Sequence, residues 1–166
     1  MNTKKLNIKN LIFTIIRIVL VIALVFAIFF FVFKKPAKSD KPFIEIKNAI
    51  TKMIETENME ENTVRFLKKY YNLNAGDFDG VLIYTPTTSM DAEEILLIKL
   101  KDDSQEDAIK KAVEERVDAK LQAFKGYAPE QYDLSKKYIL DISGGYALYV
   151  VGPDAQKIDE AFKKAL

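Results

Sequence analysis

The chain of 166 residues contains no histidine, no cysteine and no tryptophan. Without cysteine there is no disulfide, thiolate zinc site, cysteine nucleophile, cysteine-held iron–sulfur cluster or lipid-modified lipoprotein cysteine. Without histidine the usual general base near neutral pH is missing, and Ser–His–Asp catalysis is excluded. The remaining possibilities are a Ser–Lys dyad, a carboxylate pair or a cation site made only of oxygen ligands.

The charges of the chain are divided unevenly between its two parts. Residues 1–42 carry eight Lys/Arg and one acid, a net charge of +7. Residues 43–166 carry 17 Lys/Arg and 23 Asp/Glu, a net charge of −6. An acidic body argues against nucleic acid as a partner, because phosphates require a basic surface.

The basic part contains a long apolar run. Residues 11–33 are 23 residues with one charge, Arg17. A helix of this length spans about 34 Å, enough for a hydrocarbon core of about 30 Å. We therefore expect an uncleaved signal anchor, a single-pass membrane helix. A cleaved signal peptide is the alternative, but the run exceeds the usual stretch of roughly 7–15 residues. Lysines flank both ends, so the positive-inside rule gives no orientation.

The domain organisation follows from these composition changes. Residues 1–10 form a basic flank, residues 11–33 the anchor and residues 34–42 a Lys/Pro linker expected to be extended. Residues 43–166 have a normal length for one domain with one core.

Hydrophobic periodicity predicts the elements of this domain. We expect helices over 43–56, from a cap at Asn58 to Tyr71, from a Ser104/Asp107 capping box to Gly126, from Pro129, and after Asp154. We expect strands at 81–85, 94–100, 138–143 and 146–151, the last two joined through Gly144-Gly145 as a tight hairpin.

The predicted fold class is α+β. The order α-α-β-β-α-β-β-α, with a hairpin, favours a four-stranded, mainly antiparallel sheet. Helices on one face of that sheet would make a two-layer α/β sandwich.

No motif in the chain predicts catalysis. Asp77 and Asp79 do not complete a calcium loop, because Ala75 and Pro86 stand where acids are needed. Asp91, Glu93 and Glu94 have no metal-ligand spacing, and Ser135-Lys136 is more typical of a solvated helix end than of a dyad. We expect no metal, no cofactor and no catalytic residue.

Two irregular segments, residues 85–93 and 126–132, are the candidate binding surface. Both are longer than the connection requires, and loops with aromatic and amide groups often bind partners. The alternative is that Tyr127 and Tyr132 only cover the edge of the core. The candidate residues are Tyr84, Ser89, Met90, Glu93, Tyr127, Glu130, Gln131 and Tyr132.

Three segments carry a family resemblance: residues 89–95, 124–132 and 154–162. Over about 67–166 the chain resembles a family of small, uncharacterised envelope proteins of clostridia-like Gram-positive bacteria, known only as a domain of unknown function. Many members are held to the membrane by a lipid-modified cysteine, which this chain lacks. The resemblance implies a body outside the cytoplasm and carries no activity and no site residues.

Three functions remain open. The first is a non-enzymatic, membrane-tethered, extracytoplasmic accessory domain of the cell envelope that contacts an envelope protein. The second is an envelope hydrolase or transferase, or its subunit, with carboxylate or Ser/Lys chemistry, and the third is a small-ligand sensor. An enzyme predicts a deep cleft with buried Asp, Glu or Lys at its base, whereas an interaction module predicts a shallow apolar patch.

Overall fold

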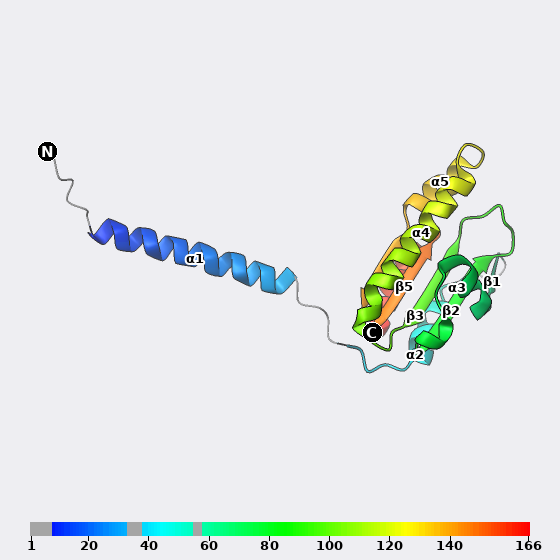
Figure 1. The fold of residues 1–166 in the computed structure, drawn as a ribbon, viewed down its shortest axis with the longest axis horizontal. Helices are drawn as coiled ribbons and strands as arrows, with labels where there is room; N and C mark the ends of the chain where they lie inside the picture. The colour runs from blue at the N-terminus through cyan, green and yellow to red at the C-terminus, as the bar shows by residue number, and fades with distance from the viewer. Residues whose placement is uncertain (1–7, 33–37, 55–57) are drawn as a thin grey trace. The chain divides into compact units, whose positions relative to one another are not determined.

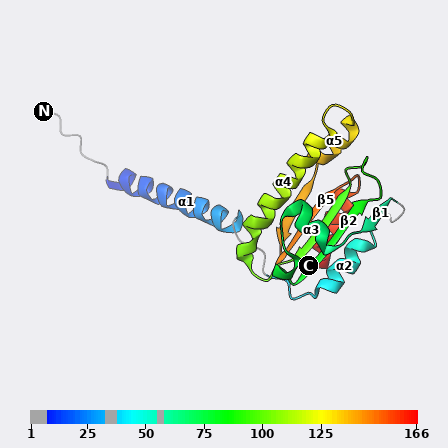
Figure 2. The ribbon, with the colours of Figure 1, turned by 45° about the vertical axis from the view of Figure 1, so that its right-hand side comes forward.

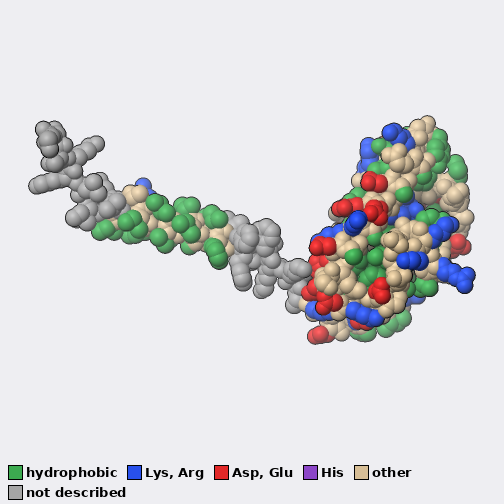
Figure 3. Space-filling model, in the orientation of Figure 1, with side chains coloured by type: hydrophobic (Ala, Val, Ile, Leu, Met, Phe, Trp, Pro, Cys, Tyr) green, Lys and Arg blue, Asp and Glu red, His purple; other side chains and the backbone are tan. Residues whose placement is uncertain are grey.

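The computed structural model describes residues 8–32, 38–54 and 58–166. The chain divides into two compact units, Met1–Pro36 and Ala37–Leu166. In the first unit the structure describes one helix, α1 (Ile8–Val32), whose described side chains at 12–27 are all exposed and mostly apolar (Figure 3). Within the described part of the chain, no helix has both the length and the hydropathy of a membrane span. Part of the predicted basic flank (1–7), the end of the predicted anchor (33) and the start of the linker (34–37) lie outside the described residues.

A five-stranded antiparallel sheet forms the centre of the second unit (Figure 1). Its order is β1-β2-β3-β5-β4, so β3 and β5 are neighbours in the middle of the sheet. The strands are β1 (Met59–Glu61), β2 (Gly80–Pro86), β3 (Glu94–Lys99), β4 (Ile139–Ser143) and β5 (Tyr146–Val151).

Among the described residues of this unit, five helices and two short 3-10 turns surround the sheet. The helices are α2 (Phe43–Thr51), α3 (Val64–Tyr71), α4 (Glu106–Phe124), α5 (Pro129–Lys136) and α6 (Ala155–Ala165). The 3-10 turns are η1 (Ala75–Asp77) and η2 (Asp103–Gln105). In Figure 2, α3 and α4 lie in front of the strands.

The sheet is buried on both faces, so the predicted two-layer, four-stranded sandwich is wrong in both respects. Side chains of β3 alternate between two separate apolar clusters: Leu96 and Ile98 pack with α3 and α4, whereas Ile95 and Leu97 pack with α2 and α6. A strand buried on both faces is apolar throughout rather than at every second residue. The unit is therefore a three-layer arrangement with helices on both sides of the sheet.

The strand that the sequence analysis did not predict is β1, and it occupies the residues where the helix from Asn58 was expected to begin. Met59–Glu61 pairs with the end of β2, and α3 begins only at Val64. The predicted Ser104/Asp107 capping box is also wrong, because Asp102 and Gln105 form the box two residues earlier, at the start of η2. Asp154 precedes α6 as predicted, but its side chain makes no cap hydrogen bond.

The predicted hairpin between β4 and β5 is confirmed. Gly144 and Gly145 both have positive φ, 60° and 80°, the conformation that a two-residue type I′ turn requires. Beside this turn, the Ser39 N–H donates to the Gly144 carbonyl at 2.8 Å, and the Tyr146 hydroxyl donates to the Lys41 carbonyl at 2.7 Å. Residues 38–41 are thus hydrogen-bonded to the hairpin end of the sheet.

Candidate functional site

A charged cluster is buried at the other end of the sheet, where β3 begins. Glu94, the first residue of β3, pairs in register with Val151, whereas the hairpin end pairs Lys99 with Tyr146. The Glu94 side chain is completely buried and lies on the α4 side of the sheet. Because residues i and i+2 of a strand share a face, Glu94 continues the apolar row of Leu96 and Ile98.

Two basic residues of α4 face this carboxylate. Arg116 donates from Nε to Oε1 of Glu94 at 3.0 Å and from Nη2 to Oε2 at 2.6 Å, a bidentate fork. Lys120, one turn further along α4, places Nζ 2.8 Å from Oε2 and also donates to the Ala92 carbonyl at 2.7 Å. Residues four apart in a helix lie on one face, so both cations reach the same acid.

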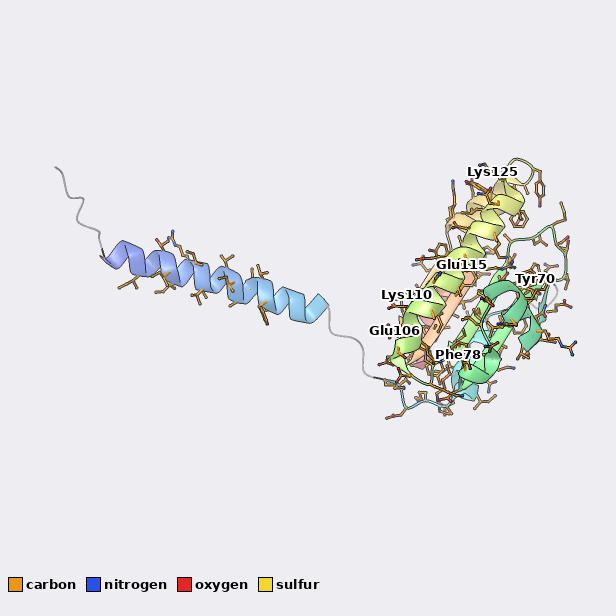
Figure 4. All side chains as sticks on the ribbon, viewed as in Figure 1. Tyr70, Phe78, Glu106, Lys110, Glu115 and Lys125 are labelled. Carbon is orange, nitrogen blue, oxygen red and sulfur yellow. The ribbon has the colours of Figure 1, made fainter. Side chains whose placement is uncertain are left out.

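The α3 helix completes the cluster with aromatic side chains. The Tyr71 hydroxyl donates to Oε1 of Glu94. The Arg116 guanidinium lies 4.6 Å from the ring centre of Tyr70 and 5.5 Å from that of Phe66. Both distances are within the range of about 6 Å over which a cation and an aromatic ring attract each other. Tyr70 is labelled on α3 in Figure 4.

Burial and pairing set the protonation of the cluster. Burial raises the pKa of Glu94, but hydrogen bonds from Arg116 and the charges of Lys120 and Arg116 outweigh it and leave that pKa below its ordinary value. Burial, together with the charge of Arg116, lowers the pKa of Lys120 below its ordinary value although Glu94 acts to raise it. Burial, with the charge of Glu94, raises the pKa of the Tyr71 phenol well above its ordinary value. At neutral pH, Glu94 is therefore ionised and Tyr71 is a neutral donor.

A cavity of about 360 Å³ opens above this cluster. Its floor is made by Glu94, Arg116 and Lys120, and its rim by the segment after β2. Apolar and aromatic side chains line the α3 and α4 walls: Phe66, Tyr70, Ala119, Ala123 and Phe124. The remaining lining residues are Glu60, Asn62, Thr85, Pro86, Thr87, Thr88, Ser89 and Asp91. This volume is within the range of small-molecule sites, roughly 300–1,000 Å³.

The structure brings part of the predicted binding surface to this cavity. Ser89 lines it, and the segment that carries Ser89 is joined to α5 because the Ala92 N–H donates to Oε1 of Gln131 at 2.9 Å. Met90 is exposed and does not line the cavity. The predicted segments 85–93 and 126–132 therefore do adjoin.

The other predicted residues of the link between α4 and α5 lie outside the cavity. Tyr127 is 57% exposed, and its ring centre lies 6.1 Å from that of Phe124. Glu130 is exposed in the first turn of α5. Tyr132 is half-buried against the core, with Lys136 Nζ 4.7 Å from its ring centre.

Tyr84 and Glu93 lie on the opposite face of the sheet. Tyr84 packs with the α2 and α6 cluster, and its hydroxyl lies 3.5 Å from Oε2 of Glu61. Glu93 lines a separate cavity of about 60 Å³ near the start of α6. The alternation of strand side chains separates them from Glu94, so they do not contribute to the charged cluster.

The described residues form neither the Ser135–Lys136 dyad nor the metal site that the sequence analysis considered. The Ser135 side chain is fully buried and donates to the Gln131 carbonyl at 2.8 Å, so it does not pair with Lys136 as a dyad. Among the described residues, no group of three acids is placed to hold a metal ion. Glu94 already binds two cationic side chains, which leaves it unsuitable as a cation ligand.

Sequence reasoning missed Arg116, Lys120 and Tyr71, and considered Glu94 only as a weak metal ligand. A signal was present in the pattern. Arg116 and Lys120 lie on the same face of the helix as Ile109, Val113 and Phe124. A helix that packs on a sheet normally carries only apolar residues on that face, so two basic residues there are unusual. An acid in the apolar row of a strand and two bases in the apolar stripe of a helix indicate a buried ion cluster.

The comparisons with known proteins identify a family but no function. The family model described as "Domain of unknown function (DUF4358)" matches residues 52–152. The match includes the cavity, the charged cluster and two of the three resembling segments, and it stops before 154–162. No curated protein and no solved structure matches the chain.

Proposed function

The chain belongs to the DUF4358 family of domains of unknown function, and we propose that its second unit is a non-enzymatic accessory module that binds a small ligand above Glu94. The observation that carries this proposal is the cavity of about 360 Å³ whose floor is a buried ion cluster, in which Glu94 pairs with both Arg116 and Lys120. Concave sites of this volume typically bind small molecules, so the cavity favours the small-ligand sensor hypothesis over a surface that only contacts a protein.

A cavity with buried Glu94 and Lys120 at its floor is also compatible with an enzyme, so the chemistry of these groups decides between the sensor and the enzyme hypotheses. A general base needs a lone pair that can accept a proton. Glu94 accepts from Tyr71, from Arg116 twice and from Lys120, and its pKa is below the ordinary value. The carboxylate is therefore structural, and binding fits the cluster better than hydrolysis or transfer.

We propose further that the chain is tethered to a cell membrane as part of the envelope. The support is the run at 11–33, with Arg17 as its only charge, and the exposure of every described side chain at 12–27. The family resemblance supports a body outside the cytoplasm. An envelope protein that contacts segments 85–93 and 126–132 would sense the ligand directly, because the first of these segments forms the rim of the cavity.

Membrane extraction and protease protection test the tether. We expect the full chain to remain with membranes after carbonate or high-salt washing, because apolar insertion does not depend on surface charge. A tag after Leu166 should be digested on wall-free intact cells. Recovery as a full-length soluble protein would refute the tether, and a tag protected until lysis would reverse the orientation.

Equilibrium dialysis tests the ligand site. The full chain in detergent micelles is dialysed against a small-molecule extract of its own cells, and the retained compounds are identified by mass spectrometry. Ala123→Phe places a large side chain in the cavity, whereas Ala108→Phe, on an exposed position of the same helix, is the matched control. We expect a compound retained by the wild type and by Ala108→Phe but lost from Ala123→Phe. Equal retention by all three proteins, or none by any, would refute the proposed function.

A further inference from the structure

The hydrogen-bonding capacity of the charged cluster is unbalanced in favour of donors. A carboxylate offers about four acceptor positions. On Glu94 these are filled by Tyr71 and Arg116 Nε at Oε1, and by Arg116 Nη2 and Lys120 at Oε2. No further donor, from the protein or from a ligand, finds an acceptor there.

The two cations, by contrast, retain N–H groups. Arg116 has five N–H donors and uses two of them on Glu94. Lys120 has three and uses two, on Glu94 and on the Ala92 carbonyl. Both residues line the cavity, and the side chains of Arg116 and Lys120 remain 15% and 6% exposed. With one acid and two bases, the floor carries a net charge of +1.

The rim of the same cavity carries the opposite charge. Glu60, on the edge strand β1, and Asp91, on the segment before β3, both line the cavity. Met59 faces the α2 and α6 cluster, so its neighbour Glu60 points to the other face of the sheet, where the cavity lies. A positive floor below a rim with two carboxylates is complementary to a molecule with an anionic and a cationic end.

We propose that this pocket takes a small zwitterion, an amino acid or a short peptide, with its carboxylate on Arg116 and Lys120 and its ammonium toward Asp91 and Glu60. The inference rests on the proposed ligand-binding function and names the class of ligand. Phe66, Phe124 and Ala123 form an apolar wall between floor and rim, which accommodates the apolar part of such a molecule.

The charges favour a carboxylate over a phosphate. A phosphate dianion would meet one unit of positive charge on the floor and two carboxylates at the rim. A carboxylate matches the single unit on the floor, and it accepts two parallel N–H bonds from a planar guanidinium. The ammonium of a zwitterion in turn neutralises part of the charge at the rim.

A panel of probes tests the proposal on the full chain in detergent micelles. The probes are the free amino acids in both enantiomers and the alanine dipeptides, each measured by the shift in the thermal unfolding midpoint and then by calorimetry. The best binder is compared with its amide, which lacks the carboxylate, and with its N-acetyl derivative, which lacks the ammonium. Inorganic phosphate is the control anion. We expect the amide to bind about 10- to 100-fold more weakly, as the loss of charged hydrogen bonds implies.

Two variants locate the two ends of the ligand. Arg116→Lys keeps the charge but removes the fork, and we expect it to weaken the zwitterion and the N-acetyl derivative equally. Asp91→Asn changes a half-buried rim residue, and we expect it to weaken the zwitterion while the N-acetyl derivative binds as before. Because Asp91→Asn leaves the Glu94 cluster intact, this comparison remains decisive even where Arg116→Lys does not fold.

The results separate this inference from the function on which it rests. Tighter binding of the amide or of phosphate, or no effect of Asp91→Asn on the zwitterion, would overturn the zwitterion and leave the pocket as a ligand site. The same holds if no probe binds while dialysis against extract retains a compound of another class. If no probe binds and dialysis retains nothing, both proposals fail.

Discussion

Arg116 holds Glu94 by both edges of its fork, with Nε 3.0 Å from one carboxylate oxygen and Nη2 2.6 Å from the other. The pair joins the middle of α4 to the first residue of β3 and links two residues that are 22 positions apart in the sequence. It therefore fixes how the long helix lies on the sheet and, at the same time, forms the floor of the cavity. Its role in stability can be measured apart from any ligand.

Glu94→Gln should destabilise the second unit strongly. The amide keeps the shape of the side chain but leaves Arg116 and Lys120 close together without their counter-charge. Breaking a buried pair in this way costs about 3–5 kcal/mol, and we expect about 3 because both cations border an open cavity. Denaturant unfolding monitored by circular dichroism measures the loss. Glu60→Gln, at the exposed rim, is the control and should change the unfolding free energy by less than about 0.5 kcal/mol. A loss of unfolding free energy in Glu94→Gln as small as that in Glu60→Gln would show that the cluster is dispensable for stability.

The contribution of Glu94 should disappear in acid. Its pKa is lowered in the folded protein, so the folded state binds its proton less readily than the unfolded chain does. The resulting stability is fully present above the unfolded pKa of about 4.3 and is lost as the pH falls through the lower folded value. The difference in unfolding free energy between wild type and Glu94→Gln isolates this residue from the other acids. That difference should be large at pH 7 and should shrink steadily below about pH 4. A difference independent of pH would contradict the lowered pKa.

Tyr71 and Tyr149 offer a matched pair, because both hydroxyls are buried on the same face of the sheet. The Tyr71 hydroxyl donates to Glu94, whereas the Tyr149 hydroxyl has no hydrogen-bond partner among the described residues. Tyr71→Phe removes a bond to a charged group and should cost about 1.5–3 kcal/mol. Tyr149→Phe removes only an unsatisfied polar group and should be neutral or stabilising by about 1 kcal/mol. The two denaturation midpoints should therefore move in opposite directions or differ clearly. A large loss in Tyr149→Phe would reveal a partner for that hydroxyl.

Much of the fold could be predicted from local patterns, and the part that failed has a physical reason. Four of the five strands and the hairpin were predicted because their apolar runs and the Gly144-Gly145 pair are local signals. The number of layers was not predicted correctly. The signal for it was present, because β3 and β5 are apolar at nearly every residue, which indicates strands covered on both faces. The strand β1 carries no such signal: Met59-Glu60-Glu61 is extended because it pairs with β2. Tertiary pairing overrode a local helix preference there.

The charged cluster was harder to predict, because it depends on the register of two distant elements. The spacing of Arg116 and Lys120 shows that they share a helix face, and Glu94 shares a strand face with Leu96. Only the packing of α4 against β3 shows that these faces meet at the same level. The predicted contact between segments 85–93 and 126–132 needed no such register, since both are irregular links at one end of the domain.

Tyr127 and Tyr132, which the sequence treats alike, should now behave differently. Tyr127 is 57% exposed, so Tyr127→Ala removes little buried area and should cost less than about 1 kcal/mol. Tyr132 packs against the core beside α4 and carries Lys136 over its ring, so Tyr132→Ala should cost roughly 1–3 kcal/mol. Denaturant unfolding of both variants gives the two values, and crosslinking in living cells measures the capture of an envelope partner. If the segment 126–132 is a contact surface, Tyr127→Ala should lose capture while it keeps its stability. Full capture by Tyr127→Ala, together with a cost of about 3 kcal/mol or more in Tyr132→Ala, would assign these tyrosines to the edge of the core, because emptied aromatic core sites cost that much.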